Sequence, residues 1–181
     1  RKPRVALWWA LAFILILIGW WEFASLRPAG APPNQLPVVA LPAGSEVAVL
    51  AGGCFWCTEA DFDKLPGVLS TTSGYTGGKT ANPTYAEVAS HATGHAEAVE
   101  LLFDPEIVSY EELLDVFWKE HDPTQRNRQG PDVGHQYRSA ILYHTPEQEA
   151  AAKASQKALE KSGKYSKPIV TEIVPAQTFW R

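Results

Sequence analysis

The two cysteines of this 181-residue chain lie three positions apart, as Cys54 and Cys57 in a Cys-x-x-Cys pair. Such a pair suits thiol redox chemistry, metal binding or a small structural disulfide. A purely structural bridge is disfavoured, because closing so short a loop removes little entropy from the unfolded chain. A zinc site would add His91 and His95, which lie much farther along the chain than the ligands of compact zinc modules. The spacing therefore favours thiol redox chemistry.

Cys54 is predicted to lie at the start of a helix. Residues 47–50 are a short apolar run typical of a strand, and Gly52-Gly53 then marks a tight turn. Residues 54–63 read as a helix that ends before Pro66-Gly67. Backbone N–H groups and the dipole at a helix N-terminus stabilise a thiolate, so Cys54 is the predicted nucleophile. Cys57 lies one helical turn further on, close enough to capture an oxidised sulfur at Cys54.

Glu97 is the candidate acid. In the predicted strand 97–103, a period of two puts Glu97 on the same face as Val99, Leu101 and Phe103. A carboxyl on a buried face has a raised pKa and stays protonated near neutrality, which makes it a usable proton donor. Strand phase alone leaves a second interpretation open, in which Glu97 lies exposed and inert at a frayed strand end.

Aromatic residues accompany these groups. Phe55 and Trp56 stand between the two cysteines, and Tyr85 and Tyr137 lie in polar stretches. Taken singly, each is more typical of a core or surface residue than of a catalytic one.

Strands and helices alternate along the rest of the chain, which predicts an α+β fold. Ser109 with Glu112 forms a capping box, and Thr145 with Pro146 begins another helix, which Gly163 ends. The glycine-rich run 74–78 predicts a loop. The irregular stretches 74–95 and 121–137 are candidate functional loops. The other predicted strands cover residues 68–73, 138–143 and 169–174, and the helices residues 109–118 and 145–163.

The N-terminal part predicts three regions. Residues 1–26 are a membrane anchor or signal segment, 27–44 a Pro/Ala-rich tether, and 45–181 the folded domain. Basic residues precede an apolar run over residues 5–21, and Trp residues lie at both of its ends. A spanning helix needs roughly 17–25 apolar residues and a signal core roughly 7–15, so length favours a retained anchor. Ala29-Gly30-Ala31 would nevertheless serve as a cleavage site.

The net charge of the chain bears on its partners, and the orientation of its apolar run bears on the compartment of the domain. The net charge of −4 argues against nucleic acid, which requires a basic face. The basic residues before the apolar run are expected to stay cytoplasmic, so the domain is expected outside the cytoplasm, on the periplasmic or extracellular side.

Seven short motifs, in order, closely resemble the A-type peptide methionine sulfoxide reductases. They are spread over most of residues 46–181, and the ordered set is far more specific than any one motif. They are Gly53-Cys54-Phe55-Trp56, Gly74-Tyr75-Thr76-Gly77-Gly78, Asn82-Pro83-Thr84-Tyr85, Thr93-Gly94-His95-Ala96-Glu97, Asp122-Pro123-Thr124, Gly130-Pro131-Asp132-Val133-Gly134 and Gln136-Tyr137-Arg138-Ser139.

The resemblance implies a fold, a reaction and a role for each residue. The fold is a two-layer α/β sandwich with a ferredoxin-like core, and no cofactor is expected. The substrate is the S epimer of methionine sulfoxide, free or in oxidised proteins, and the role is protein repair. Cys54 would attack the sulfoxide sulfur and Glu97 would protonate its oxygen. The resemblance also implies hydroxyl partners at Tyr85 and Tyr137, an apolar cage of Phe55 and Trp56, and a polar partner at Asp132.

Recycling would go through Cys57. Many members of the family have Gly at this position and recycling cysteines near the C-terminus, but no cysteine follows Cys57 here. The resemblance therefore implies a Cys54–Cys57 disulfide that a thioredoxin-type donor reduces. Two other hypotheses are a membrane-tethered thiol–disulfide exchange protein, which would need no acid at Glu97, and a non-catalytic binding module. The complete set of chemical residues argues against the last.

Overall fold

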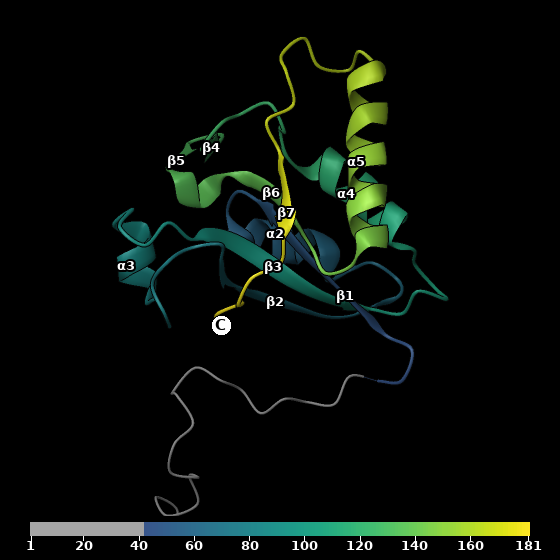
Figure 1. The fold of residues 1–181 in the computed structure, drawn as a ribbon, viewed down its shortest axis with the longest axis horizontal. Helices are drawn as coiled ribbons and strands as arrows, with labels where there is room; N and C mark the ends of the chain where they lie inside the picture. Colours follow the sequence, from purple (N-terminus) through teal and green to yellow (C-terminus); the bar gives the residue numbers. More distant parts are fainter. Residues whose placement is uncertain (1–41) are drawn as a thin grey trace, which may run out of the picture. The chain divides into compact units, whose positions relative to one another are not determined.

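A computed structural model describes residues 42–181, which form a five-stranded sheet with helices packed against it (Figure 1). Within these residues no helix is long and apolar enough to cross a membrane. The predicted span, residues 5–21, lies outside the described part of the chain. The main elements are β1 (Glu46–Gly52), α2 (Phe55–Phe62), β2 (Val68–Thr76), β3 (Ala96–Phe103), α4 (Tyr110–Glu120), β6 (Ser139–Tyr143), α5 (Pro146–Lys161) and β7 (Glu172–Pro175).

The sheet has the order β2-β3-β1-β6-β7. The first four strands pair antiparallel, and β7 pairs parallel with β6. The chain order β1-α2-β2-β3-α4-β6 is therefore the β-α-β-β-α-β arrangement of ferredoxin-like folds, with α5 and β7 added at one edge. This topology confirms the predicted α+β class.

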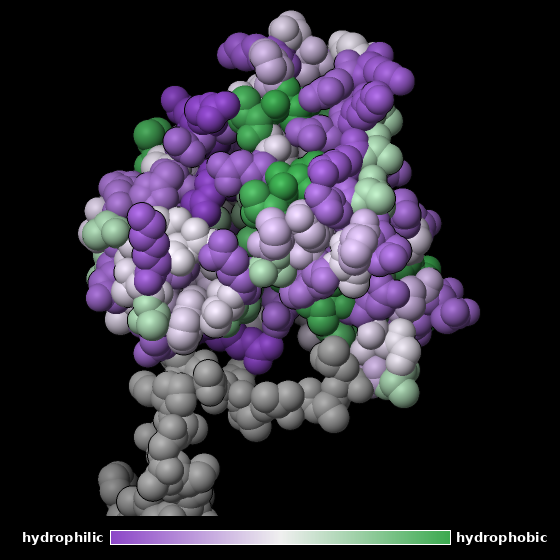
Figure 2. Space-filling model, in the orientation of Figure 1, coloured by the Kyte–Doolittle hydropathy of each residue, from purple (hydrophilic) through white to green (hydrophobic). Residues whose placement is uncertain are grey.

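One face of the sheet is covered by α2, α4 and α5. Apolar side chains of β1, β3 and β6 pack there against the three helices to form the main core. In β3, Val99, Leu101 and Phe103 all point to this face, as the period of two predicts. Figure 2 shows hydrophilic side chains over much of the viewed surface and a band of hydrophobic ones beside α5.

The opposite face carries small residues and is crossed by the C-terminal segment. Ala51, Ala96, Ala98 and Ala140 are buried there, and Phe179 packs against them. Further along, the Trp180 N–H donates to the Tyr75 carbonyl and the Tyr75 N–H donates to the Trp180 carbonyl (2.9 and 2.7 Å). The end of the chain thus pairs with the outer edge of β2.

Several elements differ from the predictions. The glycine-rich run was predicted to be a loop, which is wrong for its first part, because β2 continues through Thr76 by pairing with β3. The stretches predicted to be irregular also contain short elements. They are α3 (Tyr85–Ala89), β4 (Arg128–Gln129), β5 (Asp132–Val133) and the 3-10 helix η1 (His135–Tyr137). The capping boxes explain two starts: Ser109 begins α4 as predicted, and Thr84 begins α3.

Candidate active site

Cys54 is the N-cap of α2, as the sequence predicts. Its backbone is extended and its carbonyl accepts hydrogen bonds from the N–H groups of Cys57 and Thr58 (3.1 and 3.2 Å). Gly53, at φ +115°, makes the turn from β1 into the helix. Both thiols are free; that of Cys54 is half-buried and that of Cys57 exposed. The first turn of α2 therefore presents two thiols with different access to solvent.

Glu97 reaches this same helix start from β3. Its side chain is buried, with 4% of its surface exposed, so the frayed-end interpretation is wrong. The Phe55 N–H donates to Glu97 Oε2 (3.2 Å), which brings the carboxyl to the residue next to Cys54. Burial raises the pKa of Glu97, an effect that the Phe55 N–H partly offsets and the charge of Asp132 reinforces. The site thus has a carboxyl suited to donating a proton at the start of the helix that Cys54 caps.

Aromatic rings extend outward from Cys54. Phe55 is buried and packs against Tyr75 and Trp56, with ring centroids 5.6 and 5.3 Å apart. Trp56 is 62% exposed and stacks on Tyr85, with centroids 6.1 Å apart and an interplanar angle of 12°. A large exposed apolar surface next to a reactive thiol is suited to binding an apolar group of a substrate.

Two further predicted residues come from the long loop between α4 and β6. Asp132 lies in β5, and Tyr137 ends η1. Burial and the nearby charge of Glu97 raise the pKa of Tyr137. The charge of Asp132 acts on Glu97 and that of Glu97 acts on Tyr137, so these three groups are electrostatically linked.

Sequence reasoning missed Tyr75 as a residue of this site. Tyr75 is paired with Glu97 across β2 and β3. Burial, with smaller effects from Glu97, Tyr85 and Tyr137, raises the pKa of Tyr75 to about 12. Tyr75 could have been found from its place in the glycine-rich motif, but that motif was predicted to be a loop and so was not expected to pair with the strand of Glu97.

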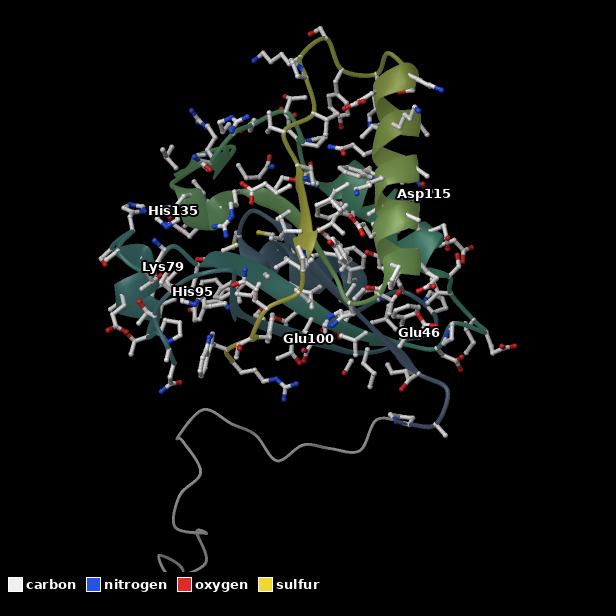
Figure 3. All side chains as sticks on the ribbon, in the orientation of Figure 1. Glu46, Lys79, His95, Glu100, Asp115 and His135 are labelled. Carbon is white, nitrogen blue, oxygen red and sulfur yellow. The ribbon has the colours of Figure 1, made fainter. Side chains whose placement is uncertain are left out.

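His91 and His95, which were considered as zinc ligands, do not form a metal site with the two cysteines. Within residues 42–181 no group of three or more His, Cys, Asp or Glu side chains is arranged to hold a metal ion. His91 instead contacts Gln136, with Nδ1 2.7 Å from Oε1. Figure 3 shows His95 and His135 on the side of the domain where α3 and η1 lie, away from Glu46 at the start of β1.

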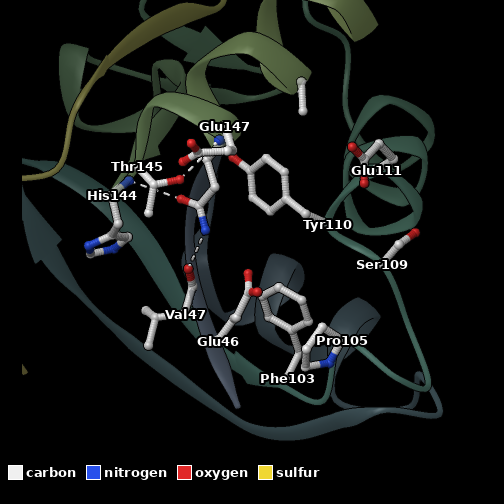
Figure 4. Close-up of a pocket in the computed structure, with 12 residues that line it drawn as sticks. Glu46, Val47, Phe103, Pro105, Ser109, Tyr110, Glu111, His144, Thr145 and Glu147 are labelled. Atoms are coloured by element: carbon white, nitrogen blue, oxygen red, sulfur yellow. Dashed lines mark hydrogen bonds between the residues drawn. The ribbon is translucent and has the colours of Figure 1, made fainter. Parts of the chain in front are cut away.

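A separate cleft of about 630 Å³ lies between the N-terminal ends of α4 and α5 (Figure 4). Glu46, Tyr110, Glu111 and Glu147 are among its lining residues, and none of the predicted site residues is. Glu111 and Glu147 lie in first helical turns, where a negative charge complements the helix dipole. Glu111 and Glu147 therefore have a structural explanation.

The thiol, the buried acid and the apolar surface together suit a nucleophilic attack in which an oxygen is protonated as it leaves. A family model described as peptide methionine sulfoxide reductase matches residues 46–181. The chain belongs to this family. Its enzymes are thiol-dependent oxidoreductases that reduce methionine sulfoxide, and this is the activity of the domain.

Individual relatives agree with the family match. The Geobacter sulfurreducens peptide methionine sulfoxide reductase MsrA is 58% identical over 135 residues, which are 75% of this chain and 83% of the relative. Reduced Mxr1 from Saccharomyces cerevisiae is 30% identical, with a TM-score of 0.73 over 79% of this chain and 83% of that one. The Corynebacterium diphtheriae methionine sulfoxide reductase A is 35% identical, with a TM-score of 0.69 over 85% and 82%.

Proposed function

We propose that this reductase acts on the S epimer of methionine sulfoxide, free or in oxidised proteins, with Cys54 as nucleophile and Glu97 as acid. The Cys54 thiolate attacks the sulfoxide sulfur, and the protonated Glu97 delivers a proton to the oxygen. A sulfur–sulfur bond forms between Cys54 and the substrate as the sulfur–oxygen bond breaks, and the protonated oxygen leaves as hydroxide. Hydroxide then adds to the Cys54 sulfur, the sulfur–sulfur bond breaks, methionine leaves, and Cys54 becomes a sulfenic acid. The sulfoxide sulfur gains the two electrons that the Cys54 sulfur loses.

One observation carries this proposal above the others. The hydrogen bond from the Phe55 N–H holds a buried carboxyl at the first turn of the helix that Cys54 begins. A simple thiol–disulfide exchange protein has no use for such an acid, because its leaving group is a thiolate. An oxide-like oxygen is a poor leaving group and needs the proton.

The aromatic surface supports the substrate class. The exposed Trp56 and the buried Phe55 together offer an apolar wall for the S-methyl group of the substrate. The hydroxyls of Tyr85 and Tyr137 are proposed to hold the sulfoxide oxygen. Asp132 is proposed as a polar partner in the same pocket.

Epimer selectivity and the role of Cys54 are tested in one assay. The chain is given S- or R-methionine sulfoxide with dithiothreitol, and methionine is measured. We expect turnover of the S epimer and its loss in Cys54→Ala. Equal use of both epimers would refute the selectivity, and full activity of Cys54→Ala would refute the nucleophile.

Cys57 is proposed to resolve the sulfenic acid by forming a disulfide with Cys54, releasing the oxygen as water. Its thiol is exposed and one helical turn from Cys54. The interaction with Cys54 and burial raise the pKa of Cys57. A thioredoxin-type donor would then reduce the disulfide; Mxr1, the yeast relative, has been crystallised in complex with Trx2.

Replacing Cys57 with Ser is expected to leave one turnover intact and to abolish thioredoxin-driven cycling. Mixing reduced enzyme with excess S-methionine sulfoxide should release about one methionine per protein in the variant, and further turnover should need dithiothreitol. Undiminished thioredoxin-driven cycling in Cys57→Ser would refute its role as the resolving residue.

The apolar run over residues 5–21 supports a further proposal, that the domain is held outside the cytoplasm by a membrane anchor. Cytosolic thioredoxin could not reach it there, so an exported donor or a relay across the membrane would supply the electrons. Protease added to cells whose outer layers have been removed but whose cytoplasmic membrane is intact should digest the domain. In a separate fractionation, the protein should sediment with the membranes. Recovery of a protected domain in the cytosol would overturn the proposal.

A further inference from the structure

The turn before Cys54 is covered by a side chain from the long loop between α4 and β6. Gly53 is buried and has a φ of +115°. A Cβ atom added to Gly53 would lie 2.6 Å from Cβ and 2.7 Å from Cγ of Gln129. The methylene groups of Gln129 therefore fill the space that a side chain at Gly53 would occupy, and they limit where the turn can move.

The amide group of Gln129 is fixed at both of its ends. The Asp122 N–H donates to Gln129 Oε1 (3.2 Å), and Gln129 Nε2 donates to the Asp122 carbonyl (3.2 Å). Asp122 is itself held, since its carboxylate accepts from Thr124 and Gln125. Gln129 thus joins the two ends of the loop segment between residues 122 and 129.

The same segment is anchored back to the strand that leads into Cys54. His121, next to Asp122, is buried, with Nδ1 2.7 Å from the Phe117 carbonyl and Nε2 2.7 Å from Ser139 Oγ. Ser139 pairs with Gly52 in the sheet. A series of contacts therefore links Gly52 to β6, His121 and the loop that carries Gln129. The contact of Gln129 with Gly53 closes this series at the residue next to Gly52.

Gln129 also belongs to the hairpin that carries other groups of the site. It is paired with Asp132 across β4 and β5. Beyond the hairpin, the Gly134 N–H donates to the Asn127 carbonyl (2.9 Å), and η1 with Tyr137 follows. One side chain thus contacts the Cys54 turn and stands in register with Asp132.

We propose that Gln129 is a positioning residue of the reductase, which sets the Gly53-Cys54 turn relative to the hairpin that carries Asp132. The proposal rests on the proposed role of Cys54 as nucleophile. A displacement of about 1 Å between reacting groups can cost up to about a hundredfold in rate. The effect of losing Gln129 should therefore fall on the chemical step more than on substrate binding.

The test replaces Gln129 with Met, which keeps the methylene groups over Gly53 and removes both amide hydrogen bonds. The matched control is Gln156→Met, because Gln156 also donates from a partly buried amide, to the Thr171 carbonyl (3.3 Å), and lies outside the site. We expect the single-turnover rate with S-methionine sulfoxide to fall about tenfold in Gln129→Met, with KM changed less than about threefold. Gln156→Met should keep the wild-type rate.

A second variant covers the case in which Gln129→Met folds poorly. Gln129→Glu keeps the side-chain length and can accept from the Asp122 N–H, but its carboxylate cannot donate to the Asp122 carbonyl. Its single-turnover rate should also fall. A single-turnover rate unchanged in a folded Gln129 variant, or equally reduced in Gln156→Met, would overturn the proposal, as would a rise in KM alone.

A second readout separates this proposal from the proposed function. In the Cys57→Ser background, mass spectrometry follows alkylation of Cys54 by iodoacetamide, which reports on this thiol whatever the enzyme's substrate. We expect slower alkylation in Gln129→Met, because a displaced turn moves the Cys54 sulfur away from its place at the N-terminal end of α2, and the reactivity of a cysteine depends on such surroundings. An unchanged alkylation rate would count against Gln129 alone, whereas turnover in Cys54→Ala would refute the nucleophile on which the proposal rests.

Discussion

At the scale of single residues, Glu97 combines two opposing influences. Burial favours its neutral form and raises its pKa, while the Phe55 N–H favours the carboxylate. Burial is the larger influence, so the protonated acid persists to a higher pH than in a free glutamate. After giving up its proton, the carboxylate still has a hydrogen-bond donor, which lessens the cost of leaving a charge in a buried place.

Glu97→Gln is expected to slow the chemical step by about 10²–10⁴-fold, because glutamine keeps the shape but supplies no proton. The wild-type single-turnover rate should fall as pH rises through the raised pKa of Glu97, whereas the variant should lack this fall. Single-turnover rates of both proteins across pH provide the measurement. An unchanged rate in Glu97→Gln would remove Glu97 as the acid.

The same group makes stability depend on pH. Because its pKa is raised in the folded state above the ordinary 4.5, Glu97 favours folding most below that ordinary value. The contribution is lost as pH rises through the raised pKa. The melting temperature of Glu97→Gln minus that of the wild type should therefore increase from pH 4 to pH 8. A difference that stays constant over this range in calorimetry would contradict the assignment.

At the scale of elements, local sequence signals determined where the helices begin. In α4, Ser109 accepts from the Glu112 N–H, while the Glu112 carboxylate accepts from the Ser109 N–H (2.8 Å). The helix then buries Leu113, Leu114 and Phe117 against the sheet. A correct start places these residues on one face, so the cap affects core packing as well as the helix end.

Ser109→Ala should lower the free energy of unfolding by about 1 kcal/mol, because the cap loses its side-chain acceptor. Ser162→Ala, at the C-terminal end of α5, removes an exposed hydroxyl that donates to the Leu159 carbonyl and accepts from the Lys164 N–H, and should cost less. Urea denaturation of the two variants makes the comparison. Equal losses would show that the capping box of α4 has no special weight.

Elements with local signals were predictable, and those that depend on distant partners were not. The helix start at Cys54 and the strand phase of Glu97 followed from glycines and a period of two. The end of β2 was missed because its pairing depends on β3 and on Trp180, far away in the sequence. The contact of Gln129 with Gly53 spans two loops, and no local pattern encodes it.

At the scale of the whole domain, the C-terminal segment covers one part of the sheet and of its β2 edge. Trp180 pairs with the outer edge of β2, and Phe179 covers alanines of the face opposite α2, α4 and α5. Arg181 adds an ion pair to Glu100 (2.6 Å) on β3. An unpaired sheet edge is a template for association with other chains, so this segment protects the domain.

Removal of residues 179–181 should lower the urea midpoint and increase light scattering on heating, because the β2 edge and the alanine face become exposed. Arg181→Ala is the control, since a partly exposed ion pair contributes about 0–1 kcal/mol. The truncated protein should lose clearly more stability than Arg181→Ala. Similar values for the two would mean that the ion pair alone holds the segment.

The different exposure of the two thiols bears on which sulfur of the proposed disulfide the reductant attacks. In a Cys54–Cys57 disulfide, an incoming donor thiolate meets the sulfur of the exposed Cys57 first. Attack there makes Cys54 the leaving thiolate, and it is released in the turn where the next sulfoxide must bind. The donor thus stays attached to the outer cysteine while the inner one is already restored. In this proposed cycle, the enzyme would accept its next substrate before its reductant has dissociated.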